Sequence, residues 1–339
     1  MPNGKKTLLI IDSNSIIHRA YHALPPLVTG KGEQTGAIYG SLLTLFKVIK
    51  EIKPNFIVAC FDIPGPTFRH KKFKDYKAKR PKLPKELSEQ IPKTKEILKL
   101  FNIPIFEKEG FEADDLIATI TKKAKKRQIY PVRGQGVSVK TQRKQTSNGV
   151  YPSLEIYILS GDLDILQLVS NNTKVYTLQK GIKKTIIYDR QEILSRFGIE
   201  PAQIVDFKAL CGDPSDNIPG VTGIGKKTAT KLLLEFASLE NLYKNLEENS
   251  EKAKNLNQKL RELLLKYKEQ AFFSKSLALA KDDVSIDFKL DPCQWKNFDK
   301  KQISEIFEKY EFYSLIKRLP EIYSLKNPVS VSQQRLIFP

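Results

Sequence analysis

The chain has 339 residues, and its 57 Lys and Arg residues outnumber its 38 Asp and Glu residues, which gives a formal net charge of +19. Hydrophobic residues make up 40% of the chain, enough to fill a core, so a chain that is disordered throughout is excluded. The 3 cysteines are too few and too widely spaced for a disulfide framework or a cysteine-rich zinc site. No apolar run approaches the roughly 20 residues that cross a bilayer. We expect a protein of the reducing cytoplasm with no membrane partner.

The positive charge is clustered along the chain. Residues 63–85 contain nine Lys or Arg residues and a single acid, Asp75, and residues 116–154 contain no acid. Lysine outnumbers arginine, a bias that genome base composition alone can produce, so net charge by itself is weak evidence. Clustering is stronger evidence, because solvated surfaces usually mix their signs and because neutralising phosphates releases counterions. The pattern favours a polyanionic partner.

Three apolar runs of strand length, at residues 7–11, 55–61 and 155–159, each lead into an aspartate. Between the first two runs, residues 36–54 have apolar residues at helical spacing and end at Pro54, which predicts a β-α-β unit. Ligands of open α/β sheets gather at the carboxyl ends of the strands, so we expect three carboxylates in one crevice. They belong to Asp12, Asp62 and Asp162.

Two segments interrupt this predicted core. Residues 64–100 are basic, with prolines near their start, and we expect a partly helical arm that ends in an amphipathic stretch. Residues 128–153 are polar and lack periodicity, which predicts a mobile insertion. From about residue 190 the pattern is helical, and the predicted helices cover residues 191–197, 201–210, 226–236, 256–265 and 302–319.

Further acids occur in three tightly spaced groups, within the sequences FEADD, SGDLD and CGDPSD. Each acid taken alone is best explained as a helix cap or turn residue, since these are ordinary positions for aspartate. If several converge, their mutual repulsion favours a bound cation, and Mg²⁺ or Mn²⁺ suits such oxygen ligands. The candidate metal-site acids are Asp12, Asp62, Glu112, Asp114, Asp115, Asp162, Asp164, Asp213 and Asp216.

Two such ions about 3.5 to 4 Å apart stabilise an in-line phosphoryl displacement and activate water, so that no amino-acid nucleophile is required. The chain has only 3 histidines, and they lie in basic surroundings, so a histidine-based mechanism is less favoured. The acids therefore predict two Mg²⁺ or Mn²⁺ ions and phosphoryl chemistry.

A glycine-rich cluster, GVTGIGKKTA, occupies residues 220–229. A turn through Gly223 and Gly225 opens a helix, so backbone N–H groups, the helix dipole, Lys226 and Lys227 would all favour one anion. No strand precedes the cluster, which disfavours a dinucleotide site, and a helix-hairpin-helix that grips a DNA backbone fits better. A K⁺ ion between the hairpin carbonyls and a phosphate fits the same arrangement. The alternative is a glycine C-cap and turn between two ordinary helices.

Five blocks of the sequence together resemble the 5′-nuclease (flap endonuclease) family, and most closely the 5′→3′ exonuclease domain of bacterial DNA polymerase I. In the family's order they are IIDSNSIIHRAYHAL, FDIPGPTFRHKKFKDYKAKRP, GFEADDLIATI, LSGDLDILQLV and LCGDPSDNIPGVTGIGKKTATKLL. The resemblance covers about residues 7–320. It implies an α/β fold of the PIN-like 5′-nuclease type, in which helices flank a central, mostly parallel sheet, a helical arch covers the active site and a helix-hairpin-helix subdomain follows.

The resemblance also implies a division of the chain. Residues 1–190 would form the α/β nuclease core, with the basic arch at about 64–100 and a flexible insertion at about 131–154. Residues 191–290 would form a helical DNA-binding subdomain, with the helix-hairpin-helix at about 201–236. Residues 291–339 would form a C-terminal helix and tail that return to the core.

The nine acids match the family's metal-site positions. By the resemblance, one ion lies near Asp12, Asp62 and Asp114, and the second lies near Asp162, Asp164 and Asp216. The remaining three acids would act directly or through water.

The family also implies contacts with DNA. Lys77 and Arg80 resemble basic residues that contact the scissile phosphate, where charge stabilisation matters most. Tyr21 would stack on an unpaired terminal base, or else pack as a half-buried core aromatic. The expected DNA-binding residues are Arg19, Tyr21, Arg69, Gly223, Gly225, Lys226, Lys227 and Thr228.

The chain departs from the family in three places. The insertion at about 131–154 lengthens a connection that is short in the family, and it would either extend the DNA footprint or have no role. Leu163 stands where bacterial relatives often have a lysine, which removes one charge contact but should leave metal binding intact. The chain ends at Pro339, so we expect a stand-alone nuclease or a truncated polymerase, without polymerisation or proofreading.

The resemblance thus predicts a structure-specific 5′→3′ exonuclease and flap endonuclease for primer removal and repair. Its substrates would be DNA with 5′ flaps, nicks or frayed ends, and RNA in RNA–DNA hybrids. We expect a monomer associated with the bacterial nucleoid that works beside a separate DNA polymerase. Two alternatives stay open: a junction-binding protein without catalysis, which the nine acids disfavour, and a PIN-like ribonuclease, which the hairpin at 220–229 and the basic arm disfavour.

Overall fold

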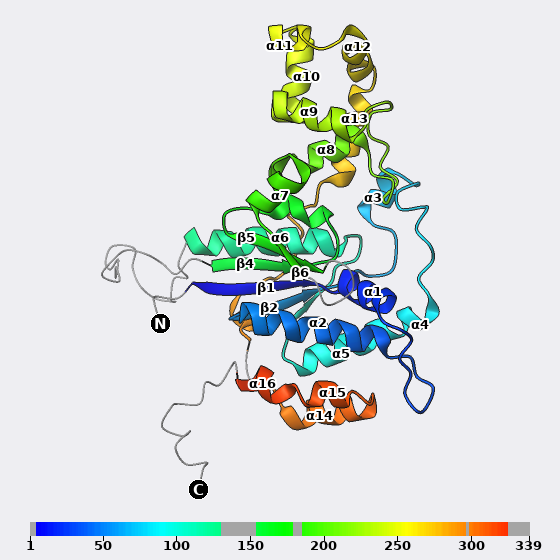
Figure 1. Ribbon diagram of the computed structural model, residues 1–339, viewed down its shortest axis with the longest axis vertical. Coiled ribbons are helices and arrows are strands. Elements are labelled where there is room, and N and C mark those ends of the chain that lie inside the picture. The colour runs from blue at the N-terminus through cyan, green and yellow to red at the C-terminus, as the bar shows by residue number, and fades with distance from the viewer. Residues whose placement is uncertain (1–4, 130–153, 179–184, 296–297, 325–339) are drawn as a thin grey trace, which may run out of the picture.

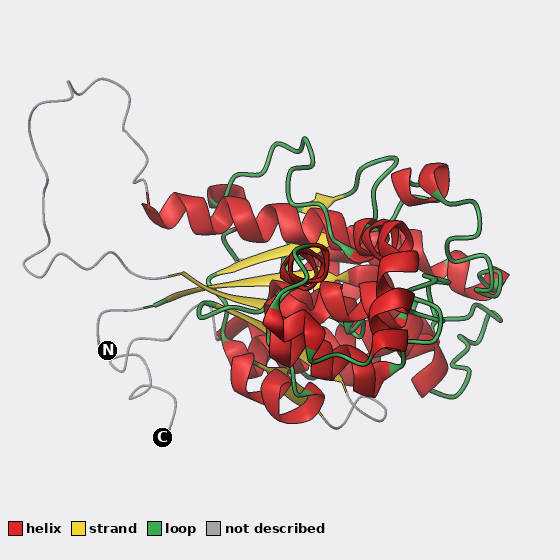
Figure 2. Ribbon diagram, turned by 90° about the horizontal axis from the view of Figure 1, so that it is seen from above, coloured by secondary structure: helices red, strands yellow, loops and turns green. Residues whose placement is uncertain are grey.

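A computed structural model describes residues 5–129, 154–178, 185–295 and 298–324, which form a six-stranded sheet with helices on both faces (Figures 1 and 2). The strand order is β3-β2-β1-β4-β5-β6, and all neighbouring strands are parallel except β5 and β6. The predicted fold class is confirmed. The strands are β1 (Lys6–Asp12), β2 (Phe56–Cys60), β3 (Ile105–Phe106), β4 (Leu154–Leu159), β5 (Thr173–Leu178) and β6 (Thr185–Tyr188).

β1 is buried on both faces because its side chains alternate between two cores. Leu9 packs with α2 (Gly36–Ile52) and α5 (Gln90–Leu100), whereas Leu8 packs with α6 (Ala113–Ile129) on the other face. Burying each such side chain contributes roughly 1.5 to 3 kcal/mol. α6 begins at the carboxyl ends of the strands and runs back over the sheet. The insertion predicted at about 131–154 follows α6 and lies, apart from residue 154, outside the described residues.

The basic arm predicted at residues 64–100 contains α3 (Phe68–Lys72), α4 (Lys85–Ser88) and α5, and turns and loop connect the first two. Its far end is fixed to the sheet domain, because the side-chain oxygen of buried Gln90 accepts hydrogen bonds from the first two N–H groups after Gly36 in α2. The arm therefore stands at the carboxyl edge of the sheet with both ends attached (Figure 1).

A helical extension rises above this edge of the sheet (Figure 1). The helix predicted at 226–236 coincides with α9, and its Leu232 and Leu233 pack in a core of the extension. Ile193 of α7 lies just after the boundary predicted at residue 190 but packs in the core of the sheet. The predicted boundary therefore stays a prediction. The helices are α7 (Arg190–Phe197), α8 (Ile204–Cys211), α9 (Lys226–Phe236), α10 (Leu239–Glu247), α11 (Glu251–Lys254), α12 (Gln258–Lys266) and α13 (Lys268–Ala278).

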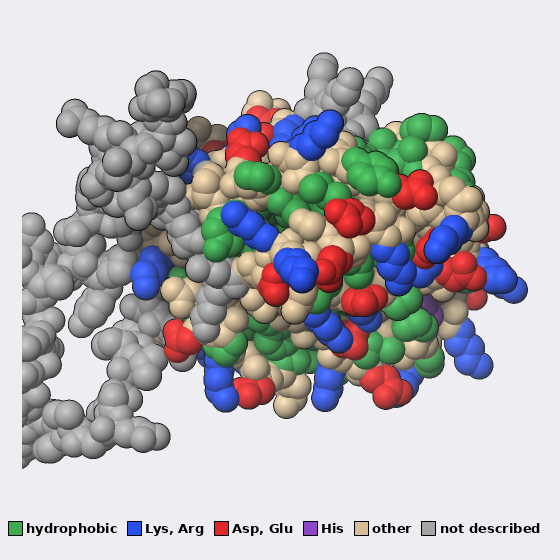
Figure 3. All heavy atoms as spheres, turned by 90° about the horizontal axis from the view of Figure 1, so that it is seen from below, with side chains coloured by type: hydrophobic (Ala, Val, Ile, Leu, Met, Phe, Trp, Pro, Cys, Tyr) green, Lys and Arg blue, Asp and Glu red, His purple; other side chains and the backbone are tan. Residues whose placement is uncertain are grey.

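The prediction of a single helix at 302–319 is wrong. The chain forms α14 (Lys300–Lys309), α15 (Tyr313–Ile316) and α16 (Leu319–Ser324), because Glu311 adopts a left-handed backbone with φ 59° and ends the first helix. These helices return to the core beside α2. Figure 3 views this face from below and shows acidic and basic side chains interspersed over it. No helix among the described residues is long and apolar enough to span a membrane.

Candidate active site

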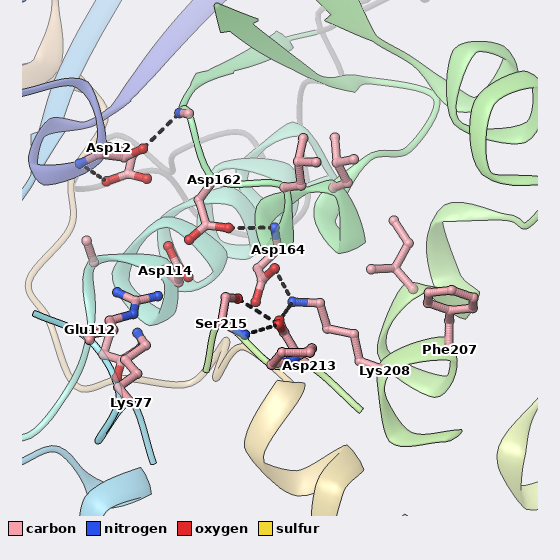
Figure 4. A pocket seen from close by; sticks show the side chains of 18 of the residues that line it. Asp12, Lys77, Glu112, Asp114, Asp162, Asp164, Phe207, Lys208, Asp213 and Ser215 are labelled. Atoms are coloured by element: carbon pink, nitrogen blue, oxygen red, sulfur yellow. Dashed lines mark hydrogen bonds and ion pairs between the residues drawn. The ribbon is translucent and has the colours of Figure 1, made fainter. Parts of the chain in front are cut away.

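A cavity of about 660 Å³ lies at the carboxyl ends of β1, β2 and β4, between the sheet, the basic arm and the helical extension (Figure 4). Seven of the nine predicted metal-site acids line it: Asp12, Asp62, Glu112, Asp114, Asp162, Asp164 and Asp213. Asp115 and Asp216 do not line it.

The ends of the strands and the starts of the helices fix the first acids. Asp12 ends β1 and caps α1 (Ser13–Ala23) by accepting a hydrogen bond from the Ser15 N–H at 3.2 Å, and it also accepts one from the Ser160 hydroxyl at 2.6 Å. Asp62 follows β2 and accepts a hydrogen bond from the Ala113 N–H at the start of α6 at 2.7 Å. For Asp12 and Asp62, the simpler explanation of a hydrogen bond to a helix start and the convergence on one cavity both hold.

Asp12, Asp62 and Asp114 form an uncompensated group, since no Lys or Arg among the described residues makes an ion pair with them. Burial, together with the charges of Asp62 and Asp162, raises the pKa of Asp12 to about 7 against the opposing hydrogen bonds from Ser160 and Ser15. Burial also raises the pKa of Asp62, and it raises that of Asp114 well above the ordinary value, with Asp162 and Asp12 adding to the effect. A cation placed here would remove this repulsion.

Asp164 and Asp213 share one lysine that the sequence reasoning missed. The Lys208 ammonium contacts Asp164 and lies 2.5 Å from Asp213 Oδ2 (Figure 4). Burial raises the pKa of Asp164 to about 7 despite this contact, and the nearby Asp162 adds to the rise. Burial also opposes ionisation of Asp213, but the Lys208 and Ser215 hydrogen bonds outweigh it and lower that pKa to about 2. Lys208 lies on α8, five residues before Asp213. This short spacing is the signal in the sequence that could have identified the lysine.

Lys77 and Arg80 line the cavity, as the phosphate-contacting role would require. The Lys77 ammonium lies 2.8 Å from Glu112 Oε2, and Arg80 lies 2.6 Å from Asp216 Oδ1. Burial opposes the ionisation of Glu112, but the Lys77 and Arg69 charges prevail and lower its pKa. Asp216 is 5% exposed and faces Tyr76 and Arg80, so its place near the second ion stays a prediction.

Arg69 does not fit the DNA-binding role expected of it. It is 3% exposed, and its guanidinium donates two hydrogen bonds to Asp115, each of 2.9 Å, and others to the Leu277 and Leu279 carbonyls. Asp115 is fully buried and also accepts from the N–H groups of Glu112 and Lys281. The pair joins α3, α6 and the end of α13, so Asp115 is a structural partner of Arg69 in this structure and does not face the cavity.

On α1, His18 lines the cavity in place of the expected Tyr21. Burial, with the charges of His22 and Arg80, lowers the pKa of His18. Tyr21 packs against the hydrophobic core and makes an edge contact with His22, which fits its alternative role as a half-buried core aromatic. Arg19 is half-buried and lies beside Gly161. Its contact with DNA stays a prediction.

The glycine-rich hairpin precedes α9 at the edge of the cavity. Gly223 has φ 89°, which favours glycine, and Gly225 is the N-cap of α9. Lys226 and Lys227 are exposed, Thr228 is half-buried, and Lys226 also lines the cavity. The N-terminal end of α9 and the acids therefore share one opening.

The donor set fits hard divalent cations. Within the described residues, no three His, Cys, Asp or Glu side chains already converge as ligands of one ion. The cavity nevertheless offers carboxylate oxygens from seven acids, and the uncompensated group makes no ion pair within the part of the chain that the structure describes. Such oxygen-rich sets suit Mg²⁺ or Mn²⁺, whose coordination is completed by water and substrate phosphate.

Solved structures share this fold. The T5 5′-exonuclease with bound zinc matches with a TM-score of 0.59 at 21% identity, over 81% of this chain and 90% of that chain. Flap endonuclease-1 from Methanococcus jannaschii matches with a TM-score of 0.58 at 18% identity, over 96% of this chain and 94% of that chain. The fold is that of the 5′-nuclease class.

Sequence comparisons identify the family within this class. The model of the 5′-3′ exonuclease N-terminal resolvase-like domain matches residues 7–133, and that of the 5′-3′ exonuclease C-terminal SAM fold matches residues 199–301. The 5′-3′ exonuclease of Aquifex aeolicus is 36% identical over 94% of this chain and 96% of its own length. The chain belongs to the 5′-3′ exonuclease family and is a nuclease of that family, so the predicted resemblance is confirmed.

DNA polymerase I of Bacillus subtilis is 38% identical over 94% of this chain, which corresponds to 32% of that polymerase. DNA polymerase I of Borreliella burgdorferi is 38% identical over 92% of this chain and 31% of its own length. The chain therefore spans about a third of the length of the polymerases that it matches.

Proposed function

We propose that this nuclease is structure-specific and cuts DNA at 5′ flaps, nicks and frayed 5′ ends with two Mg²⁺ or Mn²⁺ ions, leaving a 5′-phosphate and a 3′-hydroxyl. The observation that carries the proposal is that seven acids line one cavity together with Lys77 and Arg80. When bound, the two ions would activate water and neutralise charge on the phosphate. The uncompensated group is the best site for the first ion, because burial there is not balanced by any ion pair.

The basic side chains act on the substrate. Lys77 and Arg80 would contact the scissile phosphate and stabilise the charge that develops on it during cleavage. Both lie at the base of the arm and line the cavity with the acids. Because both already contact carboxylates, a bound phosphate would replace one anionic partner with another. They are therefore positioned to bind and orient the backbone rather than to act as a nucleophile.

The hairpin would hold the duplex. Its exposed Lys226 and Lys227 stand at the N-terminus of α9, where backbone N–H groups and the helix dipole favour phosphate. A K⁺ ion between the hairpin and the phosphate is part of this proposal. Because Lys226 also lines the cavity, a duplex held there would present one strand to the acids.

Cleavage of a 5′-labelled flap tests the proposal directly. The protein should cut the flap in Mg²⁺ and not in EDTA, and mapping the product should locate the cut relative to the junction. Asp162→Asn should slow cleavage about a thousandfold or more, while flap binding in Ca²⁺ stays measurable. Unchanged turnover in that variant would defeat the assignment of the acids.

Lys77→Ala separates catalysis from attraction. Because Lys77 would meet charge that develops in the transition state, the variant should lose more in cleavage rate than in flap affinity. Equal losses in both would indicate simple attraction. Comparing the cleavage of DNA with that of a matched RNA substrate distinguishes a flap nuclease from a ribonuclease. Cleavage of the RNA strand in an RNA–DNA hybrid tests primer removal.

The proposed setting is primer removal and repair in the bacterial cytoplasm, at the nucleoid, by a monomer beside a separate polymerase. The polymerase relatives support this setting, because each carries a region similar to this chain.

A further inference from the structure

The base of the basic arm is fastened to the turn that precedes the hairpin. We refer to residues 73–80 as the arch base and to residues 213–218 as the acid turn. Three consecutive residues of the arch base each make a hydrogen bond to the acid turn. The Asn217 amide donates to the Asp75 carbonyl at 2.8 Å, the Tyr76 hydroxyl to Asp216 at 3.1 Å, and the Lys77 N–H to the Asp216 carbonyl at 3.0 Å.

The acid turn is itself held in one shape. Asp213 and Ile218 exchange backbone hydrogen bonds of 2.9 Å across it, and the Asp213 carboxylate accepts from the N–H and hydroxyl of Ser215. At its neck, a Cβ on Gly220 would meet the Gly212 nitrogen at 2.1 Å, so a larger residue there is excluded. The turn is therefore a rigid support that continues into the hairpin.

The arch base needs this support because Lys77 has an unusual backbone. Its φ is 56°, a left-handed conformation that costs free energy in a residue with a Cβ. This conformation directs the Lys77 ammonium toward Glu112, 2.8 Å away at the cavity. The Asp75 carbonyl, which Asn217 holds, also accepts from the Ala78 N–H and so closes the turn through Lys77.

We propose that Asn217 is a positioning residue that holds the arch base on the acid turn, so that Lys77 faces the cavity. Asn217 does not line the cavity and would act through Lys77. Its own φ of 57° suits asparagine, which tolerates the left-handed conformation and provides the donor. The inference rests on the proposed function, since it assumes that Lys77 acts on the phosphate.

Two variants test the role without straining the turn. Asn217→Gly keeps the left-handed backbone and removes the amide, and Asn217→Asp keeps the shape but cannot donate. Asn249→Gly is the matched control, because Asn249 has φ 50° and lies in the exposed connection between α10 and α11. One lost hydrogen bond should make single-turnover flap cleavage about three to ten times slower in both Asn217 variants. Flap affinity should change less than twofold, and the control should match the wild type.

A second measurement uses the protein without metal or DNA. The Lys77 amide, which donates to the Asp216 carbonyl, should exchange its hydrogen about ten times faster in the Asn217 variants than in the wild type and the control. In a Lys77→Ala background, Asn217→Gly should produce no further loss of cleavage, because the effect passes through Lys77.

Two outcomes would overturn the role. They are an Asn217→Gly protein that cleaves at the wild-type rate with unchanged exchange, and one that loses as much cleavage in the Lys77→Ala background as in the wild type. Failure of the proposed function is recognised separately, because then the wild type itself does not cut the flap in Mg²⁺ or Lys77→Ala cuts it at full rate.

Discussion

Two groups of acids meet at the same edge of the sheet, but they differ in what balances their charge. In the uncompensated group, Asp12 and Asp62 accept hydrogen bonds from backbone and hydroxyl donors, and burial raises the pKa of Asp12, Asp62 and Asp114. Of the other acids, Asp162 makes no ion pair within the described residues, and the remaining five each contact a cation of the chain: Glu112 with Lys77, Asp115 with Arg69, Asp164 and Asp213 with Lys208, and Asp216 with Arg80.

The difference separates binding from support. An acid that is buried without a partner costs stability, so its position is explained by a ligand that arrives later. An acid paired with lysine or arginine already has a counter-charge, and a metal ion must displace that cation to use it. We therefore expect the first ion to bind at the uncompensated group and the second to bind more weakly beside Lys208.

The sharpest test compares two neighbours on α6, of which one faces the cavity and the other faces Arg69. Asp114→Asn should slow flap cleavage about a thousandfold or more, equivalent to about 4 kcal/mol of barrier. Because it removes a buried and uncompensated charge, the metal-free variant should unfold at the same temperature as the wild type or a higher one. Thermal unfolding in EDTA and single-turnover cleavage measure the two effects.

Asp115→Asn should show the opposite profile. Breaking the buried pair leaves Arg69 with only its longer contact to Glu112, at 3.5 Å, and losing one partner of a buried pair costs about 3 to 5 kcal/mol of stability. Chemical denaturation measures this loss. If Asp115→Asn instead stayed stable and lost cleavage as Asp114→Asn does, Asp115 would be a metal-site acid after all and the comparison would fail.

Lys208 decides how the second group binds metal. Lys208→Met removes the ammonium between Asp164 and Asp213, so an incoming ion no longer competes with it. The second Mn²⁺ should then bind about tenfold more tightly in a calorimetric titration without DNA, a gain of about 1.4 kcal/mol. Lys275→Met, which removes an equivalent lysine between Asp206 and Glu240, is the control and should leave Mn²⁺ binding unchanged. Weaker Mn²⁺ binding in Lys208→Met would show that the lysine supports the site.

The sequence allowed the cavity to be predicted, because strand ends in a parallel sheet share an edge and Asp12 and Asp62 end consecutive apolar runs. It did not distinguish Asp114 from Asp115, because the partner of Asp115 is Arg69, 46 positions away. The burial of Arg69 depends on the Leu277 carbonyl, 208 positions away, which no local pattern reveals. The break of the C-terminal helix was missed because Glu311, whose backbone is left-handed, is neither glycine nor proline and so gives no local signal.

The smallest expected effect is on the pH dependence of stability, to which one acid of each group contributes. In the folded chain the pKa values of Asp12 and Asp164 are about 7, against about 3.9 for an ordinary aspartate in an unfolded chain. Between about pH 4 and 7 the folded chain therefore binds more protons than the unfolded chain, and stability must fall as the pH rises through this window. In EDTA the Tm should drop by a few degrees from pH 5.5 to 7.5. Mg²⁺ should reduce the drop, because a bound cation replaces the protons. A drop of equal size with and without Mg²⁺ would mean that the groups responsible lie outside the cavity, and the proposed cation site at these acids would lose its thermodynamic basis.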